Sequence, residues 1–122
     1  MKPLKHATSS ASRFGGNLHD YLEIHNFMDS SKAAVADARH RAIFHSAFGI
    51  FVVEKVFGVY ITNSDNKKVS VRDIAEQHVL EDLGFIPTLD RWFEEFKLQN
   101  WMERPAIKST HHIPYENNLT KG

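Results

Sequence analysis

Hydrophobic residues recur every three or four positions through most of the chain, which is the period of amphipathic helices. The pattern predicts helices over residues 4–14, 18–28, 37–57, 70–84 and 88–96. The segment 37–57 is the longest, and apolar side chains cover well over half of its circumference. We therefore expect 37–57 to be a central helix that the other helices nearly surround. Leu4, Ala7, Ala11 and Phe14 recur at this spacing and predict a short first helix.

Residues typical of helix ends bound these segments. Glycine, which is common just after the last residue of a helix, follows three of them, as Gly15, Gly58 and Gly84. Ser70 and Thr88 stand before the last two helices, where a hydroxyl can accept a backbone N–H of the first turn. Residues 59–62 and 69–71 flank the polar run 63–66, which predicts a small hairpin.

These elements predict a mainly α fold, a single-domain helical bundle of about five helices with a small β-hairpin. Residues 1–17 are expected to form a short N-terminal helix and linker, 18–102 the helical core domain, and 103–122 an irregular C-terminal tail. The length of 122 residues, with 42% hydrophobic and 25% charged residues, is typical of one globular domain.

Composition excludes several kinds of function. The chain has no cysteine, which excludes a disulfide framework, a thiol nucleophile and a zinc–thiolate site. Fifteen basic residues balance fifteen acidic residues, so the chain lacks the positive charge that broad nucleic-acid binding requires. The longest apolar run, 48–53, is too short to span a membrane, and the start of the chain lacks the pattern of a secretory signal. We therefore expect a cytoplasmic protein.

Histidine is the one compositional anomaly, with eight residues in an otherwise neutral chain. Two histidines stand four positions before an aspartate within predicted helices, His25 before Asp29 and His78 before Asp82. Residues four positions apart lie on the same face of a helix, so each pair can offer two ligands to one cation. The pattern indicates a metal site between helices.

A third group of polar residues lies in the motif Arg39-His40-Arg41-x3-His45. His40 and His45 are about 140° apart around a helix, so only one of them can face the site. His45 shares its face with apolar residues, and we expect it to point inward. Nitrogen and oxygen ligands in such a set suit zinc, iron or manganese. The predicted ligands are His25, His45, His78 and Asp82.

Basic residues near the predicted site indicate an anionic ligand. Lys32, Arg39 and Arg41 are candidate contacts for the phosphate of a small phosphorylated molecule or a nucleotide. A divalent ion would lower the pKa of a bound water, and Glu81 is the candidate general acid or base for phosphoester hydrolysis. Salt bridges within the bundle are the structural alternative for these basic residues.

A non-catalytic function is the second hypothesis. The histidines and arginines would then form a buried hydrogen-bond network in a small binding or assembly module. An apolar stripe at Trp92, Phe93 and Phe96, together with the tail, would form the surface between subunits of a homo-oligomer.

Two motifs resemble known families. The motifs Arg39-His-Arg-x3-His45 and Glu76-Gln-His78-x2-Glu-Asp-Leu-Gly-Phe-Ile-Pro-Thr88 resemble a small uncharacterised family of bacterial and phage proteins, over roughly residues 18–93. That resemblance implies no assigned activity. His45, within Ile43-Phe-His-Ser-Ala-Phe-Gly49, also looks like the early histidine of the HD superfamily of metal-dependent phosphohydrolases, although Val79 stands where the aspartate of the His-Asp dyad would be.

Overall fold

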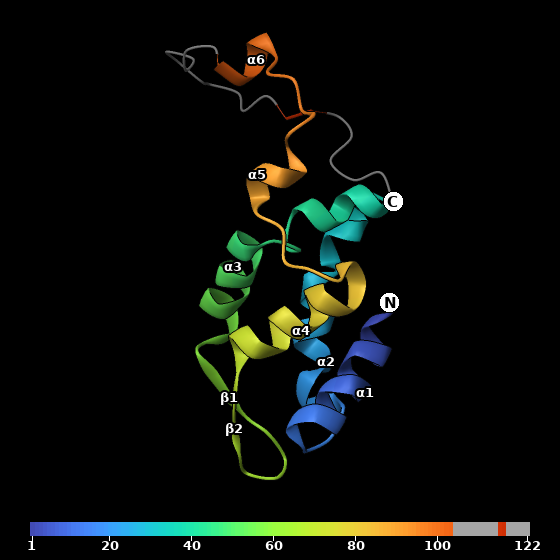
Figure 1. The fold of residues 1–122 in the computed structure, drawn as a ribbon, viewed down its shortest axis with the longest axis vertical. Helices are drawn as coiled ribbons and strands as arrows, with labels where there is room; N and C mark the ends of the chain where they lie inside the picture. Colours follow the sequence, from blue (N-terminus) through green and yellow to red (C-terminus); the bar gives the residue numbers. More distant parts are fainter. Residues whose placement is uncertain (104–114, 117–122) are drawn as a thin grey trace.

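The computed structural model describes residues 1–103 and 115–116 of the chain (Figure 1). The prediction of a mainly α domain with a small β-hairpin is confirmed. In chain order the elements are α1 (Pro3–Phe14), α2 (His19–Met28), the 3-10 helices η1 (Ser30–Ala33) and η2 (Ala38–Ala42), α3 (Ala47–Phe57), β1 (Tyr60–Thr62), β2 (Lys68–Ser70), α4 (Val71–Leu83), α5 (Leu89–Trp92) and α6 (Asn100–Glu103).

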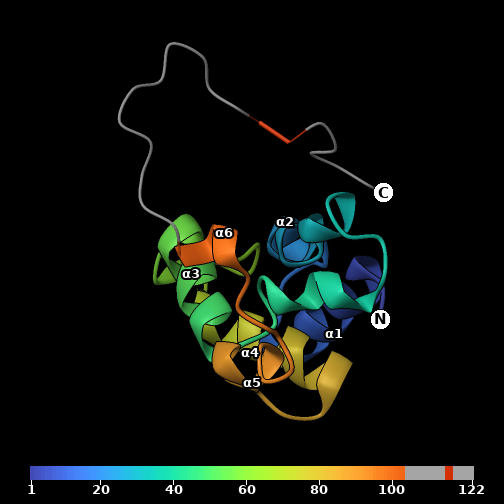
Figure 2. The ribbon, with the colours of Figure 1, turned by 90° about the horizontal axis from the view of Figure 1, so that it is seen from above.

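The helix α4, and not the segment 37–57, occupies the centre of the bundle. It packs against α1, α2 and α3, while α1 lies alongside α2 (Figures 1 and 2). The apolar core is formed mainly by α2, α3 and α4, and it includes Tyr21, Ile24, Met28, Val53, Ile74 and Val79. Buried polar side chains lie beside this core, and they come largely from α1, α2 and α4.

The predicted boundaries of α4 are confirmed. The Ser70 hydroxyl accepts the backbone N–H of Asp73, and Gly84 ends the helix in the left-handed conformation with φ of 80°. The hairpin before α4 is antiparallel, with Ile61 opposite Val69. Its turn is organised by Asn63, whose side-chain oxygen Oδ1 accepts the backbone N–H groups of Asp65 and Lys67.

The prediction of one continuous helix over 37–57 is wrong. The chain forms η2, turns, and begins α3 only at Ala47. Ser46 has an extended backbone, and its hydroxyl accepts the N–H of Gly49 to cap α3. Phe44 folds back so closely that a Cβ at Gly49 would overlap its carbonyl group, so only glycine fits there. The helical spacing of apolar residues does not reveal this break, because apolar residues occur on both sides of it.

One further expectation about helices is also wrong. The last helix ends at Trp92 and not at residue 96, because beyond Trp92 the chain leaves the body and a short helix without packing is marginal. The short first helix is confirmed as α1, in which Ala7 is buried and Ala11 and Phe14 pack against the core. Leu4 is exposed, and the buried positions of α1 are His6, Ala7 and Ser10. Most of the predicted tail, 104–114 and 117–122, lies outside the described residues.

Candidate metal centre

Four side chains from three parts of the chain meet at one point. Asp29 directly follows α2, His45 stands in the turn before α3, and His78 and Asp82 lie one turn apart on α4. Asp82 Oδ2 lies 2.9 Å from His45 Nε2 and 3.4 Å from His78 Nε2. Asp29 Oδ1 lies 3.2 Å from His78 Nε2 and 3.7 Å from His45 Nε2. We call these four residues the metal cluster.

The spacing of these atoms fits a small cation at their centre. All four ligand atoms lie within 4.8 Å of one another. Ligands at zinc–nitrogen and zinc–oxygen distances in a tetrahedron lie about 3.3 Å apart. The four distances between an imidazole nitrogen and a carboxylate oxygen, from 2.9 to 3.7 Å, fall on both sides of that value. The cluster therefore offers two imidazole nitrogens and two carboxylate oxygens at a separation that a metal ion requires.

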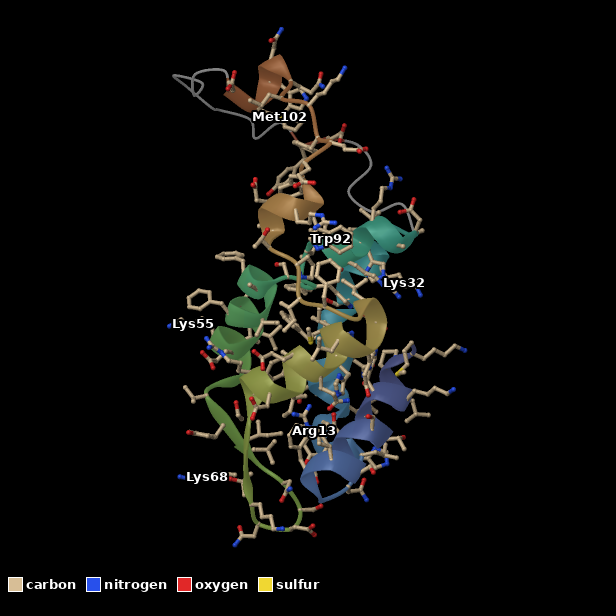
Figure 3. All side chains as sticks on the ribbon, in the orientation of Figure 1. Arg13, Lys32, Lys55, Lys68, Trp92 and Met102 are labelled. Carbon is tan, nitrogen blue, oxygen red and sulfur yellow. The ribbon has the colours of Figure 1, made fainter. Side chains whose placement is uncertain are left out.

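His45 owes its position to the break between η2 and α3. Ser46, the residue after it, caps α3, and the fold-back over Gly49 turns the chain toward α4. The indole N–H of Trp92 donates to the backbone carbonyl of His45 at 2.9 Å. This bond joins α5 to the metal cluster, and Trp92 lies at the root of the projecting C-terminal segment (Figure 3).

A buried hydrogen-bond chain behind His78 begins at Gln77. Its amide nitrogen donates to the backbone carbonyl of His6 at 3.1 Å and to Glu81 Oε1 at 2.8 Å. Both partners can only accept, which fixes the orientation of the amide. Its oxygen therefore faces Ser10, whose hydroxyl donates to it at 2.7 Å. The single proton of the Ser10 hydroxyl is thus used.

The hydrogen-bond chain continues from Ser10 through the imidazoles of His25 and His78 to the metal cluster. Because Ser10 has no proton left, His25 Nε2, at 2.8 Å, must donate to it. A neutral His25 then has a lone pair on Nδ1, which lies 2.8 Å from His78 Nδ1. His78 must carry its proton on Nδ1, and its Nε2 lone pair faces the two carboxylates of the metal cluster. A donated Nδ1–H is the usual outer support of a metal-binding histidine.

The pKa directions agree with this arrangement. Burial, reinforced by the charge of neighbouring imidazoles, lowers the pKa of His25 to about 3, so this ring is neutral at pH 7. Burial alone would lower the pKa of His78 as well, but its two carboxylate partners outweigh burial and raise that pKa. Burial alone would raise the pKa of Asp82, but hydrogen bonds from three imidazoles hold it well below its usual range. His78 Nε2 therefore attracts either a proton or a cation.

His6 is a residue of the site that the sequence reasoning missed. Its ring stacks on that of His78, with centroids 3.8 Å apart, and its Nδ1 contacts Glu81 Oε1 at 2.8 Å. Its Nε2 lies 3.2 Å from Asp82 Oδ1, which also accepts the amino group of Met1 at 2.8 Å. His6 and Ser10 stand four positions apart on α1, the same spacing as the recognised histidine–aspartate pairs. This spacing is the sequence feature that could have identified His6 and Ser10 as residues of the site.

The predicted ligands are divided between two roles. His45, His78 and Asp82 lie in the metal cluster, whereas His25 reaches it through His78. Atoms of His6, His25 and His78 also lie within 4.8 Å of one another. That group is already joined by the bond between the two Nδ1 atoms, and the other nitrogen of His25 is bound to Ser10. The fourth member of the metal cluster is Asp29, which the sequence reasoning paired with His25.

Glu81 and Arg39 lie apart from the metal cluster. The carboxylate of Glu81 accepts bonds from His6, Ser9 and Gln77, and these bonds lower its pKa although burial would raise it. The side chain of Arg39 is 82% exposed and is bonded to Asp37.

A small cavity lies beside the metal cluster and contains the other predicted anion contacts. Its volume is about 200 Å³, and Asp29, Lys32, His40 and Arg41 are among the residues that line it. Arg41 Nη2 lies 3.9 Å from Asp82 Oδ1. The hydroxyl of Ser31 donates to the carbonyl of His40, so His40 Nδ1, 3.2 Å from that hydroxyl, carries the proton and donates to it. In the neutral ring the free nitrogen is therefore Nε2.

No helix among residues 1–103 is long and apolar enough to cross a membrane. Neither the curated proteins nor the solved structures contain a match to the chain. A family model described as a domain of unknown function (DUF6915) matches residues 1–102, a wider stretch than the resemblance over 18–93 indicated. The match includes the metal cluster, the buried hydrogen-bond chain and residues 93–102 of the segment that follows Trp92. The chain therefore belongs to the DUF6915 family.

Proposed function

We propose that the domain binds one divalent metal ion through Asp29, His45, His78 and Asp82. The observation that carries this proposal is the Nε2 atom of His78, which faces two carboxylate oxygens at 3.2 and 3.4 Å. The hydrogen-bond chain behind the ring places one proton on Nδ1, so Nε2 is the position that faces the two anions, and it takes up either a second proton or a cation. A metal ion replaces that second proton and uses all four side chains as ligands.

Two imidazoles and two carboxylates favour zinc, with manganese and iron as the alternatives. The number of ligands supports zinc, because manganese and iron commonly take more than four. An ion would also neutralise the carboxylates of Asp29 and Asp82, which otherwise face the protonated ring of His78, the amino group of Met1 and the guanidinium group of Arg41.

Metal binding can be tested on purified protein that has been stripped with a chelator and titrated with zinc, manganese or ferrous ions in a calorimeter. We expect one ion per chain. Asp29→Asn keeps the shape of the side chain and removes its charge, and it should weaken binding by more than the roughly 10–100-fold typical of losing an outer hydrogen bond. Asp37→Asn, at an exposed aspartate outside the metal cluster, is the matched control. Equal affinity in both variants would refute the proposed ligand set.

The cavity beside the metal cluster favours a specific activity, the hydrolysis of phosphate monoesters. With an ion bound, the charges of Asp29 and Asp82 are neutralised, and Lys32 and Arg41 are left to balance an anion. In the reaction the oxygen of water attacks phosphorus, the P–O ester bond breaks, and the departing alcohol takes up a proton. A bound divalent ion supplies a water of lowered pKa. His40 lines the cavity and is the group placed to exchange that proton.

A generic substrate such as 4-nitrophenyl phosphate tests this activity in the metal-loaded protein. Arg41→Gln should reduce kcat/KM at unchanged metal content, because it removes a cation from the cavity. Arg39→Gln, a substitution of the same type outside the cavity, should leave the rate unchanged. No turnover with any of the three metals, or equal effects of both substitutions, would reject the hydrolase while leaving metal binding to stand on its own titration.

A further inference from the structure

One face of α3 is covered with apolar side chains that have no partner in the described part of the chain. Ile50 and Val53 point into the core, but Phe48, Phe51 and Val56 are exposed, Phe48 to 55%. The two phenylalanine rings lie 5.9 Å apart, and the ammonium group of Lys55 lies 5.2 Å from the ring of Phe51. We call this surface the α3 face. Contiguous exposed aromatic residues on a small domain commonly mark an interaction surface.

A second apolar surface lies on residues 93–103, which we call the arm. Leu98 is 71% exposed and Trp101 is 64% exposed, and Phe96 is exposed as well. Beyond Trp92 the arm extends away from the body and ends with α6 (Figure 1). Within the described part of the chain, the hydrogen bonds of residues 94–103 join only residues close in sequence, and α6 stands apart from the body (Figure 1). The family match reaches residue 102, so the arm is part of the family domain.

The two surfaces are complementary in charge as well as in polarity. The arm carries three glutamates, Glu94, Glu95 and Glu103, against one lysine, Lys97. The α3 face carries Lys55, and Lys68 of the hairpin lies on the same side of the molecule (Figure 3). An acidic aromatic arm therefore fits a basic aromatic face.

The direction of the arm favours a second copy of the chain as the partner. Seen along the long axis, α6 lies on the same side of the molecule as α3 (Figure 2), whereas Figure 1 shows it displaced along that axis. An arm that points away from its own α3 face meets the same face of a neighbour related by a two-fold axis across the long axis. Two-fold dimers are the commonest protein oligomers, and their contacts occur in identical pairs.

We propose that two copies of the chain form a dimer by exchanging arms. Each arm places Phe96, Leu98 and Trp101 on the α3 face of the other copy, over Phe48 and Phe51. The dimer then contains two identical arm-to-face contacts. This proposal does not depend on metal binding, and it assigns a role to both unpaired surfaces at once.

The test measures mass by light scattering during size-exclusion chromatography, with the full chain over a range of concentrations. The wild type should be a dimer. Trp101→Ser on the arm and Phe51→Ser on the α3 face should each weaken the dimer by about 1,000-fold, since a central aromatic is worth about 30-fold and each homodimer loses two contacts. Leu4→Ser, at an exposed apolar residue of α1, is the matched control and should remain dimeric. Circular dichroism checks that each variant is folded.

Mixing the two variants distinguishes arm exchange from other dimers. The Phe51→Ser chain retains an unaltered arm, and the Trp101→Ser chain retains an unaltered α3 face. In their heterodimer this arm meets this face, so one of the two contacts is intact. The heterodimer should form at concentrations at which neither variant dimerises alone, because both losses fall in the other contact, where Trp101 and Phe51 are partners and the second loss adds little to the first. A wild type that is monomeric throughout, a variant that dimerises like the wild type, or a mixture that stays monomeric would overturn the proposal.

Discussion

Replacing Ser10 with alanine removes one hydroxyl from the buried chain that fixes the proton of His78. The hydroxyl donates to Gln77 at 2.7 Å and accepts from His25 at 2.8 Å. Both partners are buried, and both lose their bond in Ser10→Ala. His25 is then free to carry its proton on Nδ1, which would push the proton of His78 toward the nitrogen that faces the metal cluster.

The size of the effect follows from these two unpaired groups. A buried polar group left without a hydrogen bond costs about 1–3 kcal/mol. Two such groups, partly relieved by direct contact with each other, give an expected loss of about 2–4 kcal/mol in the free energy of unfolding. For a domain of this size, at roughly 3–6 °C per kcal/mol, the loss lowers Tm by about 6–24 °C. Zinc affinity should fall by about 10–100-fold, the usual effect of losing support behind a metal-binding histidine.

Urea unfolding with and without zinc, and calorimetric titration of zinc, measure both effects. Ser12→Ala is the matched control, since Ser12 is an exposed serine on the same helix. The control should change the free energy of unfolding by less than about 0.5 kcal/mol and leave zinc affinity unaltered. If Ser10→Ala resembles the control in zinc affinity, the hydrogen-bond chain does not set the proton on His78, and the argument for the metal cluster loses its basis.

Three further predictions concern the same region. Gly49→Ala should destabilise the protein by more than about 2 kcal/mol in thermal unfolding, because the new methyl group overlaps the carbonyl of Phe44; a neutral effect would contradict the fold-back. Zinc affinity should rise from pH 6 to pH 8, since protons compete for His78 Nε2 and its pKa is raised above 6.5; calorimetry showing constant affinity would argue against His78 as a ligand. Trp92→Phe should cost about 1 kcal/mol by removing the bond to the carbonyl of His45, and urea unfolding would show it; an unchanged midpoint would mean that the bond contributes nothing.

Much of the fold could be predicted because its helix ends are marked by local chemistry. Ser70 and Thr88 accept the backbone N–H groups that their positions indicated, and Gly84 ends α4. The break before α3 could not be found in this way. Ser46 is one of several polar residues in the periodic run 37–57, and its capping role depends on Gly49 and on the path of Phe44, which only the folded chain determines.

The metal cluster could be predicted in part, because histidine–aspartate spacing on a helix is visible in the sequence. His78 and Asp82 lie together as that spacing implies. The division between His25 and Asp29 was not visible, since both share one side of α2 and only the position of α4 decides which of them reaches the cluster. His6 was missed because α1 buries a polar face, and a search for apolar periodicity assigns the buried side to Leu4 instead.

The indole N–H of Trp92 joins the root of the arm to the backbone carbonyl of His45, a residue of the metal cluster. An arm held by a second copy would restrain this carbonyl, and an ion held by the His45 imidazole would restrain the same residue. If the two restraints are coupled through this bond, thermodynamic reciprocity requires ion binding and dimerisation to change each other's affinity by equal factors.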